Sequence, residues 1–165
     1  MIEYIGKRPA MRTWLAFTLA VLALVAVSLI GSGFMPGPWY EALQKPAFNP
    51  PSWLFGPVWG VMYLLNAVAL GLVLKARRSA ARNTALLAFA VQLVLNAAWT
   101  PVFFGAQSIG GALLVIVALL AAIVWTILAA GQVQRWAGHL LWPYLAWVGF
   151  ATVLNASIWL LNRAG

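Results

Sequence analysis

The chain lacks several residue types on which much protein chemistry depends. It has no cysteine, which excludes disulfides, thiolate metal sites and cysteine nucleophiles, and leaves its redox compartment undetermined. Its two acidic residues, Glu3 and Glu41, are far apart in sequence, so a paired-carboxylate acid–base site is excluded. Neither a Walker loop nor a dinucleotide fingerprint is present. Ordinary hydrolytic or redox catalysis is therefore not expected, and the sequence predicts no metal site and no required cofactor.

Charge is scarce as well. Only 7% of the 165 residues are charged, 64% are hydrophobic, and the mean hydropathy is +0.93. These values are typical of an integral membrane protein and lie outside the range of soluble globular domains. The charged residues leave four uncharged runs, which are residues 13–40, 46–74, 83–134 and 136–162.

The uncharged runs predict the number of helices. A membrane-spanning helix needs about 20 apolar residues, so the first, second and fourth runs hold one helix each. The third run is long enough for two, and Pro101, Gly105, Gly110 and Gly111 mark a turn inside it. The predicted fold is an all-α integral membrane protein, with five transmembrane helices bundled in a single domain over residues 1–165. The helices are expected over residues 13–35, 52–74, 83–104, 108–132 and 138–161.

The first predicted helix has an alternative interpretation. Basic residues at positions 7, 8 and 12 precede it, as they do in a signal peptide. The apolar stretch from Thr13 to Ile30 exceeds the roughly 7–15 residues of a signal peptide's apolar region and lacks a clear small-residue cleavage site. A retained helix is therefore favoured.

The basic residues are divided unequally between the two ends of such a bundle. Five crossings put the termini on opposite sides, and eight of the ten basic residues then share the N-terminal side. This asymmetry predicts a cytoplasmic N-terminus and an outer C-terminus in a bacterial cell membrane. Contact with anionic lipid head groups explains the net charge of +8, and no nucleic-acid motif accompanies it. The eight residues are Lys7, Arg8, Arg12, Lys75, Arg77, Arg78, Arg82 and Arg135, and the other two are Lys45 and Arg163.

Residues 36–51 form a segment rich in proline and aromatic residues between the first two predicted helices. Its prolines lack backbone N–H groups and push the preceding residues out of the helical region, so an ordered non-helical loop is expected. Glu41 and Lys45 have the i, i+4 spacing that favours one short helical turn before Pro46. Lys45 either pairs with Glu41 in water or meets a ligand carboxylate. Because the prolines leave fewer backbone states to lose on closing, the loop is predicted to act as a pocket lid.

Aromatic rings and amides recur with helical spacing on three predicted helices. Exposed amides are costly in hydrocarbon, so these side chains should face other helices or a cavity. A pocket would use the flat rings to sandwich a planar ligand and the amides to orient it. The alternative, favoured for Asn66, is that the amides only join helices, at about 0.6 kcal/mol per hydrogen bond. The stripes are Trp59, Tyr63 and Asn66; Gln92, Asn96 and Trp99; and Tyr144, Trp147, Ala151 and Asn155.

Outside these stripes, His139 and several tryptophans suggest contacts with the membrane. His139 is in principle a haem ligand, but its position beside Arg135 and Trp136 at the basic end favours an interfacial side chain. Trp14, Trp125 and Trp136 are expected to be lipid-facing or interfacial anchors. The fourth predicted helix, nearly all Ala, Leu, Ile and Val, is expected to face lipid.

Three segments carry a specific resemblance. They are W-Y-x-x-L-x-K-P-x-x-x-P-P-x-W-x-x-G-P-V-W over residues 39–59, QLVLNAAWTPVFF over residues 92–104, and PYLAWVGFATVLN over residues 143–155. In this order they resemble the tryptophan-rich sensory protein and translocator protein family, and the likeness extends over nearly the whole chain. The resemblance implies a site for porphyrins and drug-like aromatic ligands. It assigns Tyr40, Trp59, Asn96 and Trp147 to that site.

The leading hypothesis is a membrane receptor, sensor or translocator for tetrapyrroles such as protoporphyrin IX and haem, linked to tetrapyrrole or stress regulation. Sterol-like and benzodiazepine-like molecules would share the pocket. The alternative is a light- and oxygen-dependent breakdown of bound porphyrin that uses Trp59 and Trp147, and a third interpretation is a scaffold without a ligand. The predicted ligand-binding residues are Tyr40, Trp59, Tyr63, Gln92, Asn96, Trp99, Tyr144, Trp147, Ala151 and Asn155.

Two further expectations follow from the resemblance. Family members are often homodimers through the third helix, where small residues at positions 81, 85 and 88 would let two backbones approach. The animal proteins carry a sterol-associated tyrosine and arginine where Ala156 and Leu160 stand here, so sterol recognition by that segment is in doubt.

Overall fold

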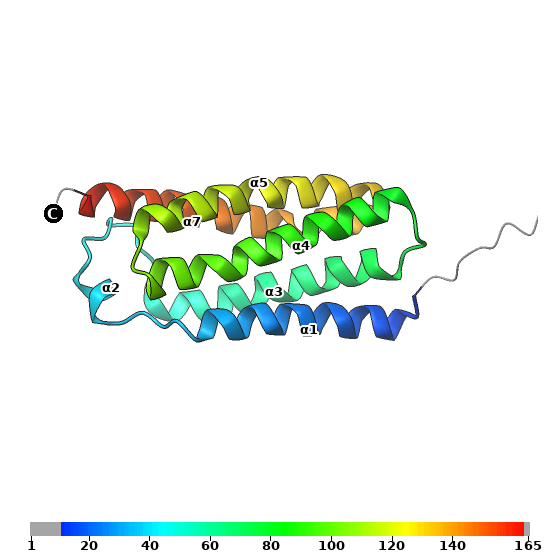
Figure 1. Cartoon of the computed structure of the whole chain (residues 1–165), viewed down its shortest axis with the longest axis horizontal. Coiled ribbons are helices and arrows are strands. Elements are labelled where there is room, and N and C mark those ends of the chain that lie inside the picture. The colour runs from blue at the N-terminus through cyan, green and yellow to red at the C-terminus, as the bar shows by residue number, and fades with distance from the viewer. Residues whose placement is uncertain (1–10, 164–165) are drawn as a thin grey trace, which may run out of the picture.

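The computed structural model describes residues 11–163, and within them the chain is helical, without strands. Its long helices lie side by side along one axis (Figure 1). Five segments are long and apolar enough to cross a membrane, as predicted. In chain order the elements are α1 (Thr13–Ser32), α2 (Pro38–Ala42), α3 (Ser52–Lys75), α4 (Ala80–Thr100), η1 (Pro101–Gly105), α5 (Ile109–Val133), α6 (Arg135–His139) and α7 (Trp142–Asn162).

Several helix ends differ from the prediction, each for a local reason. α1 ends at Ser32, three residues early, ahead of Pro36. α4 begins at Ala80 because the Ser79 side chain caps it by accepting a hydrogen bond from the Arg82 N–H at 3.1 Å. The fifth predicted helix is divided into α6 and α7 by a turn at residues 140–141, and Pro143 lies in the first turn of α7, where a missing N–H costs no hydrogen bond.

The turn predicted between residues 104 and 108 is confirmed, but Pro101 is not part of it. Pro101 continues α4 into η1, a π-helical turn that closes with the Ala106 N–H donating to the Pro101 carbonyl at 2.8 Å. The chain reverses only after this turn, at Gln107, whose φ is 53°. Gly110 and Gly111 lie inside α5 and are not turn residues. A π-helical turn has no simple sequence signature, so spacing alone did not show that Pro101 continues the helix instead of starting the turn.

Small residues allow the helices to approach closely. A Cβ built on Gly71 of α3 would clash with the Phe17 ring of α1, so any side chain at this position requires that ring or the helices to move. Ala85 and Ala88 of α4 are fully buried in the chain's own bundle, where α4 packs against α5 and α1. Two of the three small residues predicted to join two copies are therefore covered within one chain.

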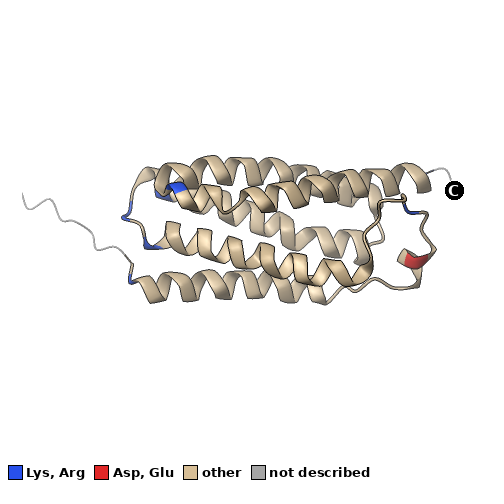
Figure 2. Ribbon diagram, turned by 180° about the vertical axis from the view of Figure 1, so that it is seen from behind, with Lys and Arg blue, Asp and Glu red and all other residues tan. Residues whose placement is uncertain are grey.

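Most of the Lys and Arg residues among those described lie at one end of the bundle (Figure 2), and α2, which contains Glu41, lies at the other end (Figure 1). Arg82, only 7% exposed, donates from Nε and from a terminal nitrogen to the carbonyls of Val73 and Leu74 at 3.2 and 2.9 Å. These contacts cap the C-terminal end of α3, where a cation is favoured. Three charged residues used in the sequence predictions, at positions 3, 7 and 8, lie outside the described residues.

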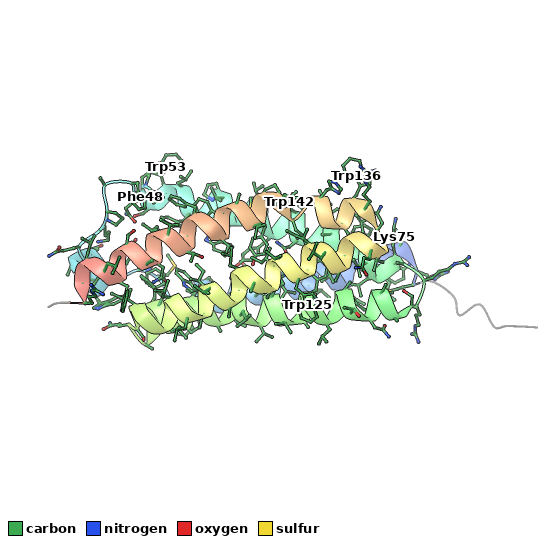
Figure 3. All side chains as sticks on the ribbon, turned by 90° about the horizontal axis from the view of Figure 1, so that it is seen from above. Phe48, Trp53, Lys75, Trp125, Trp136 and Trp142 are labelled. Atoms are coloured by element: carbon green, nitrogen blue, oxygen red, sulfur yellow. The ribbon has the colours of Figure 1, made fainter. Side chains whose placement is uncertain are left out.

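Tryptophan side chains project from both ends of the bundle. Trp53 and Trp136 point away from it near opposite ends (Figure 3) and are 73% and 66% exposed. Trp14 and Trp125 are exposed as well, as lipid-facing anchors require. His139 is also exposed, with Nδ1 2.7 Å from the Arg135 carbonyl oxygen, which agrees with its predicted location beside the basic loops.

Candidate ligand-binding cavity

A cavity of about 640 Å³ opens at the α2 end of the bundle. This volume lies within the range of about 300–1,000 Å³ that is typical of small-molecule sites. α3 supplies Trp59 and Tyr63 to its wall, α4 supplies Trp99, and α2 supplies Tyr40. Gly60, also on α3, has open space where a Cβ would be, which helps to keep the cavity clear.

The π-helical turn contributes two aromatic residues to the cavity wall. Because a π-helix turns less per residue than an α-helix, the adjacent residues Phe103 and Phe104 both line the cavity. Trp99 stacks on Phe103 at 5.1 Å between ring centroids, and the Tyr40 ring meets Phe104 edge-on at 5.3 Å. The Trp99 indole nitrogen donates to Asn155 Oδ1 at 3.1 Å, which holds this ring in one orientation.

The loop over residues 36–51 covers part of the cavity and is tied down locally. The predicted short helical turn is confirmed as α2. Lys45 Nζ donates to the backbone carbonyls of Glu41 and Leu43 at 3.1 and 3.0 Å and lies 4.6 Å from the centroid of the Tyr40 ring. Burial raises the pKa of Tyr40 above its ordinary value, although a hydrogen bond to Asn49 opposes this shift, so the phenol stays neutral at physiological pH.

Two hydrogen bonds, called the Asn162–Gln44 clip below, join the same loop to the end of the last helix. Asn162 of α7 accepts from the Gln44 N–H at 3.0 Å and donates to the Gln44 carbonyl at 2.9 Å. Paired side-chain bonds to one backbone residue fix both its position and its orientation. The lid is therefore anchored at Gln44 to a helix that also contributes to the cavity wall, through Leu154 and Ile158.

Beneath the cavity lies a buried amide–tyrosine chain, made of Tyr63, Asn96, Tyr144, Gln92 and Asn66. The Tyr63 hydroxyl donates to Asn96 at 3.2 Å, and Asn96 donates to the Tyr144 oxygen at 2.7 Å. The Tyr144 hydroxyl donates to Gln92 at 3.2 Å, Gln92 donates to Asn66 at 3.1 Å, and Asn66 donates to the Met62 carbonyl at 3.0 Å. The chain links α3, α4 and α7 through hydrogen bonds that the protein interior would otherwise leave unmade.

The ten predicted site residues fall into three groups. Tyr40, Trp59, Tyr63 and Trp99 line the cavity. Gln92, Asn96, Tyr144 and Asn155 do not line it, but they support it from behind through hydrogen bonds. Trp147 and Ala151 are neither in the lining nor in these hydrogen bonds, although both pack against the hydrophobic core.

Trp147 lies behind the cavity wall. Its ring centroid is 6.0 Å from that of Phe55, which does line the cavity, and 5.5 Å from that of Phe150. Its indole nitrogen is buried and has no hydrogen-bond partner among residues 11–163.

The sequence predictions omitted Phe103 and Phe104 from the site, because these residues entered only as the end of the motif over residues 92–104. They also missed Gly56 and Gly60, which line the cavity beside Trp59 on α3. The i, i+4 spacing of these two glycines was a usable signal that one face of this helix is open.

Five apolar spans around an aromatic cavity define a multi-pass integral membrane protein with a pocket of ligand size. Residues 16–160 match the model of the TspO/MBR family. The chain is 42% identical over 152 residues to the tryptophan-rich protein TspO of Chlorobaculum tepidum, a match that covers 90% of this chain and 96% of that protein. The chain therefore belongs to the TspO/MBR family, and the resemblance seen in its motifs is confirmed.

Animal and other bacterial relatives are similarly close. The chain is 41% identical over 139 residues to the translocator protein of Homo sapiens, covering 81% of this chain and 82% of that protein. It is 37% identical over 149 residues to the tryptophan-rich sensory protein of Cereibacter sphaeroides, covering 90% and 92%. Relatives of similar sequence identity are thus named either translocator protein or tryptophan-rich sensory protein.

Proposed function

We propose that this protein binds tetrapyrroles, such as protoporphyrin IX and haem, and other planar apolar ligands in the cavity, and that binding serves sensing or translocation. The proposal rests above all on the aromatic cavity of about 640 Å³ beneath a tethered loop. Its relatives' names, translocator protein and tryptophan-rich sensory protein, agree with either role. A link to tetrapyrrole or stress regulation belongs to the same proposal.

The two walls suit a flat ligand. On α3 the Trp59 and Tyr63 rings lie 5.5 Å apart with an interplanar angle of 35°. On α4 and η1 the Trp99 and Phe103 rings are stacked at 26°. Aromatic faces on two sides of an apolar space favour a planar conjugated molecule between them.

A pair of tryptophan variants tests the site. Porphyrin binding to the protein in lipid nanodiscs would be followed by the change in porphyrin absorbance. Trp59→Ala removes an aromatic wall and should weaken binding by at least about tenfold. Trp125→Ala removes an exposed tryptophan from α5, away from the cavity, and should leave binding unchanged. Equal affinity of the wild type and Trp59→Ala, with both folded, would refute the site.

The enzymatic alternative receives less support. Light-driven breakdown of porphyrin needs oxidisable tryptophans against the macrocycle, and of the two candidates Trp59 lines the cavity whereas Trp147 lies behind Phe55. Sterol-like ligands remain a weaker proposal, because Ala156 and Leu160 stand where the animal segment has its tyrosine and arginine.

We also propose the topology inferred from charge, with the basic loops on the cytoplasmic side of a bacterial cell membrane and the cavity end outside. For a homodimer through α4, the exposed face with Leu87, Ala90 and Val94 is the available surface. A single cysteine introduced at Leu87 or at Val94 should cross-link two copies if this face forms the dimer interface. A single cysteine at Leu114, on the exposed surface of α5, serves as the control and should not cross-link.

A further inference from the structure

Tyr63 belongs to both the cavity and the buried amide–tyrosine chain. Tyr63 is one of the residues that line the cavity, and its hydroxyl starts the hydrogen bonds that end at the Met62 carbonyl. We propose that this chain holds Tyr63 as a hydrogen-bond acceptor toward the cavity, so that the site selects planar apolar ligands bearing an O–H or N–H group over isosteres that only accept. The inference rests on the proposed function, because it concerns what the same cavity binds.

The direction of the hydrogen bonds is set at the deep end of the chain. A backbone carbonyl can only accept, so the Asn66 side-chain atom 3.0 Å from the Met62 oxygen must be the amide nitrogen. The amide oxygen of Asn66 then faces Gln92, and only the NH₂ group of Gln92 can donate to it. The oxygen of Gln92 is thereby left to accept a hydrogen bond from Tyr144.

Two further steps carry this direction to the cavity. Tyr144 donates its single hydroxyl proton to Gln92, so its oxygen accepts from the NH₂ group of Asn96. The oxygen of Asn96 consequently accepts the proton of Tyr63. Reversing any one amide would bring two acceptors, or two donors, into contact within a buried chain.

Tyr63 therefore offers only lone pairs to a ligand. A phenol has one proton, and here that proton is held by Asn96. Turning it toward an acceptor in the cavity would leave the oxygen of Asn96, a residue only 6% exposed, without a donor. A ligand that donates to Tyr63 avoids this penalty, so we expect a donor to be preferred over an acceptor-only isostere by about tenfold or more.

Two probes of the same shape test the preference. 9-Fluorenol and 9-fluorenone share a planar tricyclic skeleton, but the alcohol can donate and the ketone can only accept. Their dissociation constants would be measured by tryptophan quenching in lipid nanodiscs. The ratio of the two constants would then be compared between proteins, because unequal partition of the probes into lipid cancels in that comparison.

Two variants separate a polar contact from a merely structural role. Tyr63→Phe keeps the ring and removes the acceptor, so the preference for fluorenol should fall by about tenfold or more relative to the wild type. Asn96→Leu keeps Tyr63 but removes the acceptor of its proton, which frees that proton for fluorenone. The preference should therefore fall in this variant too, although the Tyr63 hydroxyl is still present.

The outcomes distinguish the inference from the proposed function. An equal probe ratio in the wild type and Tyr63→Phe would overturn the inference alone, provided that protoporphyrin still binds. Binding of protoporphyrin with neither probe would also overturn it, because a cavity that selects by one polar contact must admit the smaller ring. Saturable binding of none of the three molecules would refute the proposed function itself.

Discussion

The buried amide–tyrosine chain makes a prediction about stability that does not depend on any ligand. Gln92 is fully buried and has both ends of its amide in hydrogen bonds, one with Asn66 and one with Tyr144. Gln92→Leu preserves the approximate size of the side chain and removes both bonds. The Asn66 oxygen and the Tyr144 proton are then left without partners.

Two estimates of the stability lost in Gln92→Leu differ. In a water-soluble protein each orphaned buried group costs about 1–3 kcal/mol, which would give about 2–6 kcal/mol for the two groups. In a membrane the separated helices also find partners for their polar groups, and interhelical hydrogen bonds average about 0.6 kcal/mol with a maximum of about 1.7. We expect the membrane estimate to apply, so that Gln92→Leu lowers the free energy of unfolding by about 1–3 kcal/mol.

The assay is unfolding in lipid bicelles, with three companion variants, one of which is Asn66→Leu alone. Gln132→Leu makes the same substitution at an exposed position on α5 and should change stability by less than about 0.5 kcal/mol. Gln92→Leu combined with Asn66→Leu removes the orphaned oxygen and should recover part of the loss. A double variant as unstable as the sum of its two single variants would refute the coupling through this hydrogen bond.

Three other predictions concern the helix contacts and the lid. Arg82→Gln removes the cationic cap from the end of α3 and should lower the free energy of unfolding by about 1–3 kcal/mol, measured in the same bicelle assay; an unchanged stability would show that the cap contributes nothing. Gly71→Ala should lower the melting temperature by about 2–12 °C because its Cβ would meet the Phe17 ring, and adding Phe17→Ala should reverse part of that loss; no recovery would contradict the steric cause. Asn162→Ala breaks the clip to Gln44 and should speed porphyrin release about 3- to 10-fold in stopped flow without unfolding the bundle, whereas an unchanged release rate would mean that the loop does not gate the cavity.

The sequence by itself determined the membrane class, the number of long helices and the family. Uncharged runs longer than a bilayer's thickness leave little choice of fold, because every backbone polar group must be satisfied inside a helix. The predicted short helical turn before Pro46 is found as α2, but α2 ends at Ala42, so the Glu41 and Lys45 spacing on which it was based does not lie within the helix. The spacing of Gln92, Asn96 and Trp99 correctly put one face of α4 inside the bundle. These are local properties, which a single helix carries in its own spacing.

Only the tertiary structure decided how those faces meet. Helical spacing identified Trp147 as a candidate but did not show that it contacts Phe55 of the cavity lining without lining the cavity itself. For Asn66 the helix-joining role favoured from the sequence is confirmed, but only the structure shows that its partner is Gln92 of α4. The physical reason is that spacing sets which residues share a face, whereas the rotation and axial offset of one helix against another depend on close contacts such as Gly71 with Phe17.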